Sequence, residues 1–314
     1  MTVCIAARCG GADDPFIIGA SDRMLTAGDV EFEPEQPFLK MGGVTSSIAV
    51  MVAGDSALQT ELVQKVRAEV DRRIAAEPKT WLMVEDVARL YSHYYAEARL
   101  RRSEFRYLAP LGLDRNSFIA RQQQMDPGLV QSVATELVNV EMPGVSTIFA
   151  GSDPSGLHIY VVREGEVSCE DGVAFAAIGI GAGHANSQFM LARHGWGKPF
   201  AATLLLTYSA KKRSEIAPGV GAGTDMFTVT ARLGSLSDIG DHVMRELQTM
   251  YEKMVTDERK AFAKAQERAD KYVKAIVAAS TTQAQAAVPK DGGGSASADK
   301  KDISSGPQEV EPKA

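Results

Sequence analysis

The sequence predicts an α+β protein built from layers of strands and helices. Short apolar runs alternate with turn residues near the start of the chain and again after residue 145, a pattern typical of buried strands. Longer segments with apolar residues every three or four positions follow both sets of strands, as expected of amphipathic helices. About 230 residues of this kind are enough for one large hydrophobic core.

Extended segments and two helices are expected in the first part of the chain. The extended segments are residues 2–8, 16–23, 38–41 and 47–55. The last of them breaks at Gly54, and Asp55 or Ser56 caps a helix over about residues 55–75. One face of this helix should be buried, through Leu58, Leu62, Val66 and Val70. A second helix over about residues 84–102 ends in arginines, which suit a helix C-terminus.

The later elements follow the same alternation. A strand pair is expected at residues 146–153 and 157–162, with Pro154-Ser155-Gly156 as its turn. Two helices, at about residues 185–192 and 200–208, and a strand at residues 226–230 complete the domain. Residues 105–143 break the pattern and are interpreted as an insertion, either a cap or subunit contact or a surface excursion.

The C-terminal part differs in composition. We assign residues 1–234 to the layered domain and residues 235–280 to a charged helical extension that starts at about Ser237. Residues 281–314 are rich in Ala, Gly, Ser, Lys and Pro, and should be a disordered tail because they hold too few apolar groups to form a core.

Composition excludes several classes of function. The net charge of −6 argues against a general nucleic-acid binder, since such proteins present a basic face to phosphates. The three cysteines fit neither a disulfide framework nor a zinc site, which favours a cytoplasmic location. No segment approaches the apolar length of about 20 residues that a membrane helix needs, so no membrane association is expected.

No cofactor or metal is expected either. The glycine-rich segments 179–183 and 219–223 complete neither the dinucleotide-binding spacing nor the Walker pattern. The five histidines are scattered, without a pair at the spacing of metal ligands on a helix. His184 is the one histidine near the candidate site described next, and a structural or surface role is its simpler interpretation.

Thr2 is the strongest candidate for chemistry. Removal of Met1, which is expected before a small residue, would leave Thr2 with both a hydroxyl and a free α-amine. An α-amine has a pKa of about 8 and can accept the hydroxyl proton without a histidine. The pair is therefore a complete nucleophile and base.

The residues that follow Thr2 carry a family resemblance. Asp22 ends the second strand, Lys40 lies at the head of another extended segment, and Ala53-Gly54 stand before a helix. In this order and spacing the chain resembles the proteasome β-subunits and the bacterial HslV-type peptidases, which are N-terminal-nucleophile hydrolases. The likeness covers about residues 2–98 and 145–230.

The resemblance implies a four-layer α/β/β/α sandwich and a role for each matching residue. Thr2 would be the nucleophile, with its own α-amine as base, and the N–H of Gly54 would bind the oxyanion. Lys40 would lie close to Thr2 and stabilise its developing negative charge, while Asp22 would hold Lys40 in place.

The resemblance also implies a substrate and an assembly. Arg23 and Thr26 would line the cleft for a peptide or protein substrate, and the chain would form a homo-oligomeric ring, with any ATPase partner left unassigned. Ile180 stands where the family usually has a serine, and the later Asp-x-x-Ser-Gly pattern is missing around residues 218–225. The alternative function is a catalytically silent, proteasome-like scaffold or binding subunit.

Overall fold

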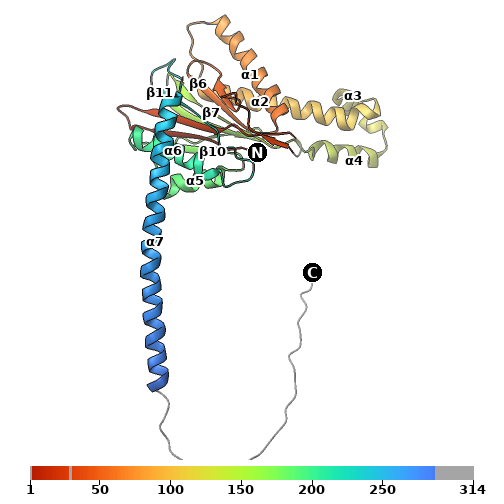
Figure 1. The fold of residues 1–314 in the computed structure, drawn as a ribbon. Helices are drawn as coiled ribbons and strands as arrows, with labels where there is room; N and C mark the ends of the chain where they lie inside the picture. The colour runs from red at the N-terminus through yellow and green to blue at the C-terminus, as the bar shows by residue number, and fades with distance from the viewer. Residues whose placement is uncertain (1, 28–29, 287–314) are drawn as a thin grey trace, which may run out of the picture. The chain divides into compact units, whose positions relative to one another are not determined.

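The computed structural model describes residues 2–27 and 30–286 of the chain (Figure 1). Within them lie two five-stranded antiparallel sheets, a separate two-stranded hairpin and seven α-helices. The α+β class is therefore confirmed. None of these helices combines the length and the apolar character that crossing a bilayer requires.

The first sheet has the strand order β10-β1-β2-β11-β12. Its strands, in chain order, are β1 (Cys4–Cys9), β2 (Phe16–Asp22), β10 (Phe175–Ile178), β11 (Thr224–Thr230) and β12 (Ser237–Asp238). The second sheet has the order β5-β6-β7-β8-β9. Its strands are β5 (Met41–Gly43), β6 (Ile48–Gly54), β7 (Val145–Asp153), β8 (Gly156–Arg163) and β9 (Glu166–Cys169). The hairpin consists of β3 (Leu25–Ala27) and β4 (Val30–Phe32).

The two sheets face each other through a shared apolar cluster. Cys4 and Ala6 of β1 meet Ala49 and Met51 of β6 in this cluster. Their chain neighbours point the other way, because side chains alternate between the two faces of a strand. The uninterrupted apolar run at the start of the chain is therefore a strand buried on both faces.

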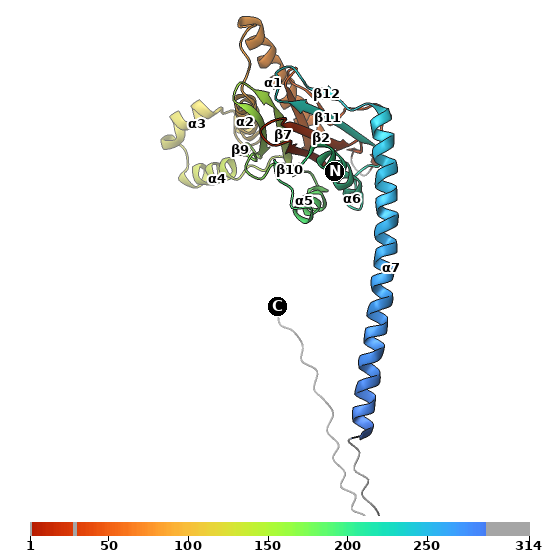
Figure 2. The same ribbon diagram turned by 90° about the vertical axis from the view of Figure 1, so that its left-hand side faces the viewer.

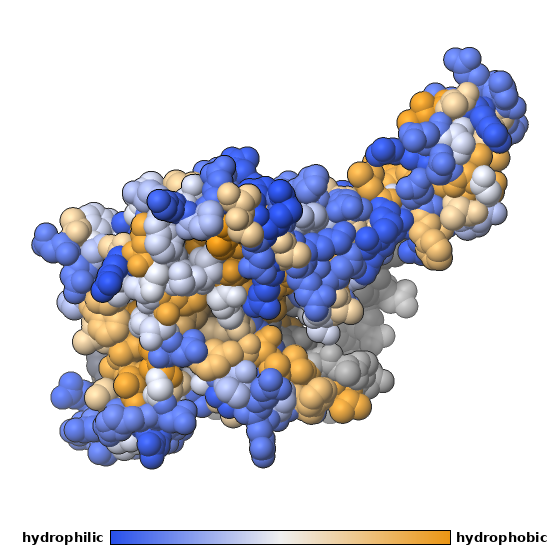
Figure 3. Space-filling model, turned by 90° about the horizontal axis from the view of Figure 1, so that it is seen from above, coloured by the Kyte–Doolittle hydropathy of each residue, from blue (hydrophilic) through white to orange (hydrophobic). Residues whose placement is uncertain are grey.

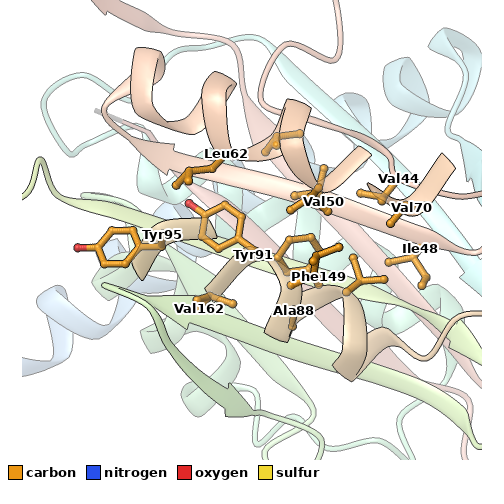
Figure 4. Packing of buried hydrophobic residues seen from close by; sticks show 14 of the residues in the cluster. Val44, Ile48, Val50, Leu62, Val70, Ala88, Tyr91, Tyr95, Phe149 and Val162 are labelled. Atoms are coloured by element: carbon orange, nitrogen blue, oxygen red, sulfur yellow. The ribbon is translucent and has the colours of Figure 1, made fainter. Parts of the chain in front are cut away.

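Two helices cover the outer face of the second sheet. They are α1 (Ser56–Ala76) and α2 (Val84–Ser103). Asp55 caps α1 through a bond from the N–H of Leu58, as the sequence predicts. Tyr91 of α2 packs edge-on against Phe149 of β7 (Figure 4). The predicted stripe of α1 is buried in the same cluster, so the helical periodicity is confirmed.

Two further helices cover the outer face of the first sheet, α5 (Ala182–Leu191) and α6 (Phe200–Ser214) (Figure 2). Val3, just before β1, and Ile5 and Ala7 of β1 contact this layer, where Phe189 of α5 is fully buried. Both sheets are thus covered by helices on their outer faces.

Residues 104–143 form a small helical unit with a core of its own. It contains α3 (Arg115–Arg121), α4 (Pro127–Val138) and short π and 3-10 turns at residues 104–108, 109–111 and 122–124. Leu108, Phe118 and Val133 are buried against one another. The interruption in the sequence pattern is therefore an ordered helical insertion.

The last described helix is α7 (Asp241–Ala286). Leu247 is buried with Tyr208 of α6, and the chain up to Lys253 belongs to one compact unit. Residues 254–286 belong to a second unit and continue as helix. Residues 281–286 of the predicted tail are part of this helix, and residues 287–314 lie outside the described residues.

The expected start of this helix at Ser237 is wrong. Ser237 and Asp238 form β12 and pair with Thr228 and Phe227 of β11. Their backbone groups complete the edge of the first sheet, and this pairing is a long-range interaction that helical periodicity does not reveal.

His158 of β8 leads to a prediction about how stability depends on pH. His158 Nδ1 lies 2.6 Å from Asp171 Oδ2, and this contact raises the pKa of His158. Because the raised pKa belongs to the folded state, stabilisation by the charged imidazole is complete below about pH 6.5 and is lost as the pH rises through the folded pKa. We expect His158→Gln to remove this loss of unfolding free energy in urea titrations between pH 6 and about 8. His184→Gln, an exposed change on α5, is the control, and an unchanged pH slope in His158→Gln would contradict the assignment.

Candidate active site

Thr2 and Asp22 meet because β1 and β2 are antiparallel neighbours. Cys4 pairs with Ser21, so the start of β1 lies beside the end of β2. Thr2 Oγ1 donates a hydrogen bond to Asp22 Oδ1, and the N–H of Val3 donates to the same oxygen at 2.9 Å. Two residues separated by 19 others in the chain are thus brought into contact by strand register.

Lys40 reaches this pair from the second sheet. Its carbonyl accepts from the N–H of Val52 at 2.9 Å, which continues the β5–β6 pairing by one residue. Its Nζ lies 2.6 Å from Thr2 Oγ1 and 2.9 Å from Asp22 Oδ2. Thr2, Asp22 and Lys40 are 2 %, 0 % and 6 % exposed. The three predicted side chains therefore form one buried cluster between the sheets.

Asp22 is fully saturated with donors. Besides Thr2, Val3 and Lys40, it accepts from the N–H of Met24 at 3.1 Å and from the N–H of Gly221 at 3.0 Å. A buried carboxylate needs such a set, because an unpaired charge away from water is very costly. The saturation fixes the carboxylate, which in turn orients the lysine toward the threonine hydroxyl.

Cys4 lies next to this cluster and is chemically inert. Burial raises the pKa of its thiol to about 12, and its Sγ contacts the carbonyl of Val52. A thiolate, the reactive form, is therefore disfavoured at neutral pH. Of these two side chains, the Thr2 hydroxyl is therefore the candidate nucleophile.

Gly54 ends β6 at the position expected of an oxyanion donor. Successive N–H groups of a strand point to opposite sides, so the N–H of Gly54 points to the same side as that of Val52. Val52 bonds Lys40, but β5 begins only at Met41, and Gly54 pairs with Val145 of β7 and with no residue of β5. Its N–H therefore points away from β7, and Gly54 lines the cavity beside Thr2.

The backbone at Gly54 requires glycine. Its φ of +109° is rarely adopted by residues with a side chain, and an added Cβ would stand 2.1 Å from the carbonyl oxygen of Gly144. The close approach of β6 to the start of β7 thus depends on the absence of a side chain at this position.

A cavity of about 270 Å³ opens at Thr2, Lys40 and Gly54. Most of its wall is apolar, with Met24 and Leu25 on one side and side chains of β6 and α1 on the other. Its remaining lining residues are Phe38, Leu39, Met41, Val50, Val52, Ala53, Ser56, Gln59, Thr60, Val63, Gln64 and Arg67. A cavity of this size and polarity can hold a side chain of a bound peptide.

The segment that departs from the family pattern also touches Thr2. The N–H of Gly181 bonds the carbonyl of Thr2 at 3.2 Å, and a Cβ at Gly179 would stand 2.8 Å from Thr2 Cγ2. Ile180, between the two glycines, is 53 % exposed. The isoleucine therefore leaves this contact intact, and its side chain is only partly buried.

Arg23 and Thr26 occupy different surroundings from the four residues above. Arg23 is paired with Asp225 at 2.6 Å, and Asp225 also accepts from the N–H of Phe38 at 2.8 Å. The ion pair thus anchors the segment that leads to Lys40. Thr26 lies in β3 opposite Glu31, and its side chain is outside the described residues.

Two contributors to the site have no signal in the sequence. Both come from beyond residue 218: the N–H of Gly221 bonds Asp22, and the carboxylate of Asp225 holds Arg23 and the N–H of Phe38. The glycine spacing there resembles a phosphate loop, and only tertiary contacts show that a backbone amide is directed at Asp22. Within the described residues, no group of three or more acidic, histidine or cysteine side chains could hold a metal ion.

Comparison of the chain with protein-family models finds no match, and comparison with curated proteins finds none. The interpretation of the site therefore rests on its geometry and on the motifs in the sequence.

We expect Gly54→Ala to destabilise the fold by about 2–5 kcal/mol, from backbone strain and from the clash with Gly144. Gly112→Ala is the matched control, because Gly112 has a φ of +69° but open space around its Cα. That change should cost only the strain, about 1–2 kcal/mol. Urea denaturation measures the free energy of unfolding of both variants. Equal losses in the two variants would show that the close approach to Gly144 does not restrict the side chain at residue 54.

Proposed function

We propose that this protein is a threonine-nucleophile amidohydrolase that cleaves peptide bonds. One observation carries the proposal: the Thr2 hydroxyl lies 2.6 Å from a buried lysine at the wall of a mostly apolar cavity. Lys40 provides a positive charge at the oxygen that must become negative, and Asp22 holds that charge in place.

The mechanism requires cleavage of the peptide bond between Met1 and Thr2. The freed amine takes the proton from Oγ1 as the oxygen attacks the substrate carbonyl carbon. The carbonyl oxygen becomes an anion that the N–H of Gly54 stabilises. The protonated amine then gives its proton to the leaving nitrogen, the C–N bond breaks, and an ester on Thr2 remains. Water, activated by the same amine, hydrolyses the ester and frees the threonine.

The architecture supports this assignment. Two face-to-face sheets with helix pairs on both outer faces correspond to the four-layer α/β/β/α sandwich that the family resemblance implies. Thr2 lies two residues before the first strand, and Lys40 is joined to the opposite sheet by its bond with Val52. We propose the N-terminal-nucleophile hydrolase fold on these grounds.

Assembly into a homo-oligomeric ring is part of the proposal. Apolar side chains are exposed on the helical surfaces, among them Met190 and Leu191 of α5 and Phe105 and Val138 of the insertion. Figure 3 shows apolar atoms among hydrophilic ones on the insertion, which extends to the upper right of that view. Contacts between copies would remove this apolar surface from water. An ATPase partner is left unassigned.

The scaffold alternative is favoured by one observation. Thr2 is only 2 % exposed, and a threonine in a saturated hydrogen-bond cluster can serve as a structural link between two sheets. A silent subunit would keep the Asp22–Lys40 ion pair and would show no reaction at Thr2.

Covalent labelling distinguishes the two functions. We expect intact mass spectrometry of the protein from its native host to show a chain that begins at Thr2. Incubation with a β-lactone should then add one probe mass, located on Thr2 by peptide mapping. Retention of Met1 throughout, or a Thr2-terminal protein that remains unlabelled, would overturn the enzymatic assignment in favour of the scaffold.

Substitution at Thr2 should abolish the reaction without unfolding the protein. Thr2→Val keeps the side-chain volume and removes the hydroxyl, while Asp22 retains Lys40 and three backbone donors. We expect Thr2→Val to lose labelling and peptide hydrolysis entirely, and Thr2→Ser to keep both. Lysine variants are less suitable, because removing one member of a buried ion pair costs about 3–5 kcal/mol of stability. Hydrolysis by purified Thr2→Val would contradict the assignment of the nucleophile.

A further inference from the structure

Lys211 of α6 is a fully buried lysine that the mechanism above does not use. Its side chain is 0 % exposed, and its Nζ lies 2.8 Å from Glu215 Oε1. The same nitrogen donates to the carbonyl of Gly221 at 2.8 Å and to the carbonyl of Ala222 at 3.0 Å. Burying an ammonium group costs several kcal/mol, so a buried lysine at this position needs specific contacts that offset this cost.

The segment that Lys211 binds is the one that reaches Asp22. The carbonyl of Gly221 accepts from Lys211, while the N–H of Gly221 donates to Asp22 Oδ2 at 3.0 Å. An added Cβ at Gly221 would stand 2.9 Å from Met24 Cβ, so the backbone passes very close to the chain after Asp22. A single residue thus links the buried lysine to the carboxylate of the site.

We propose that Lys211 is a positioning residue of the threonine-nucleophile site, holding Gly221 so that its N–H stays on Asp22. This inference rests on the proposed function. With Gly221 fixed, Asp22 keeps its orientation toward Lys40 while negative charge develops on the Thr2 oxygen. Without Lys211, the carbonyls of Gly221 and Ala222 lose their buried donor, and the segment is free to move away from the carboxylate.

The charged groups around Lys211 come from three parts of the chain. Lys212 lies on α6, Glu215 follows its last residue, and Asp22 faces Lys211 from β2. Glu33, which follows β4, accepts from the N–H groups of Ala222 and Gly223. The segment 221–223 is therefore held by carboxylates on its N–H side and by a lysine on its carbonyl side.

Burial lowers the pKa of Lys211 to about 8, against the opposing effect of Glu215. The lysine therefore carries its proton at neutral pH and loses it as the pH rises through about 8, which should weaken the hold on Gly221. The unfolded chain binds more protons than the folded one between about pH 8 and 10.5, so this group makes the free energy of unfolding rise with pH in that window. If Lys211 is a positioning residue, activity should therefore fall as the pH rises above about 8, while the contribution of Lys211 to the free energy of unfolding should rise.

The test compares Lys211→Met with Lys212→Met. Lys212 pairs with the same Glu215, at 2.6 Å, and its Nζ lies 3.5 Å from the carbonyl oxygen of Ala222, whereas the bond to the carbonyl of Gly221 comes from Lys211. The readout is the rate of β-lactone labelling at Thr2 between pH 6 and 10, with kcat and KM for a peptide substrate. We expect Lys211→Met to slow labelling at pH 7 by about tenfold to a hundredfold, as when a hydrogen bond to a charged group is weakened. The loss should be in kcat, and the decline of the wild type above pH 8 should be absent.

Lys212→Met should label within about twofold of the wild type and keep its pH profile. Hydrogen exchange followed by mass spectrometry provides a readout that needs no activity. Peptides that contain residues 219–224 should exchange faster in Lys211→Met and unchanged in Lys212→Met. This second measurement separates a displaced segment from a general loss of folding, which would raise exchange across all strands.

Each outcome decides the question. A wild type that starts at Thr2 but does not label overturns the proposed function and this inference with it. A labelled wild type together with Lys211→Met that keeps the wild-type rate, pH profile and exchange overturns this inference alone. Faster hydrogen exchange across the whole Lys211→Met protein would show a general structural role for Lys211, and would also overturn this inference.

Discussion

The ion pair between Asp22 and Lys40 is the constraint on which the rest of the site depends. Asp22 belongs to one sheet and Lys40 to the backbone pairing of the other, so their contact at 2.9 Å joins the two layers at one point. Both charges are removed from water, and such a pair is tolerated only when its remaining hydrogen-bonding capacity is filled. The bonds that fill it come from Thr2, Val3, Met24 and Gly221. The Thr2 hydroxyl is therefore held by the same contacts that make the buried charge pair acceptable.

The layers around this pair explain why the cluster is packed between the two sheets and also borders a cavity. The shared apolar cluster fixes the distance between the sheets, and α1 and α2 fix the end of β6 through the packing of their buried faces. The pairing of β6 with β5 ends at the bond between Val52 and Lys40, and Gly54, two residues further along β6, lines the cavity. Electrostatic stabilisation of a developing anion needs donors that are already in place before reaction, and the proposed function would take them from these strand ends.

Much of the fold could be read from local patterns. The stripe of α1, its Asp55 cap and the β7–β8 hairpin all follow from side-chain periodicity and turn chemistry. The start of α7 could not be read in this way, because Ser237 and Asp238 have no strand-like pattern and are extended only through pairing with β11. The insertion was recognisable as an interruption, whereas its core of Leu108, Phe118 and Val133 depends on contacts between separate short helices.

By itself, the sequence determined which residues can do chemistry. They are a threonine whose hydroxyl and amine can serve as nucleophile and base, and Asp22, Lys40 and Gly54, whose spacing is similar to that of the peptidase family named above. It determined this because those properties belong to residue types and to short-range order along the chain. Only the tertiary structure decided that Gly221 directs its amide at Asp22 and that Arg23 is paired with Asp225. It also decided that Lys211 is buried behind the glycine-rich segment. These contacts join residues about 200 positions apart or groups of the backbone, and backbone amides have no identity in a sequence until the fold sets their direction.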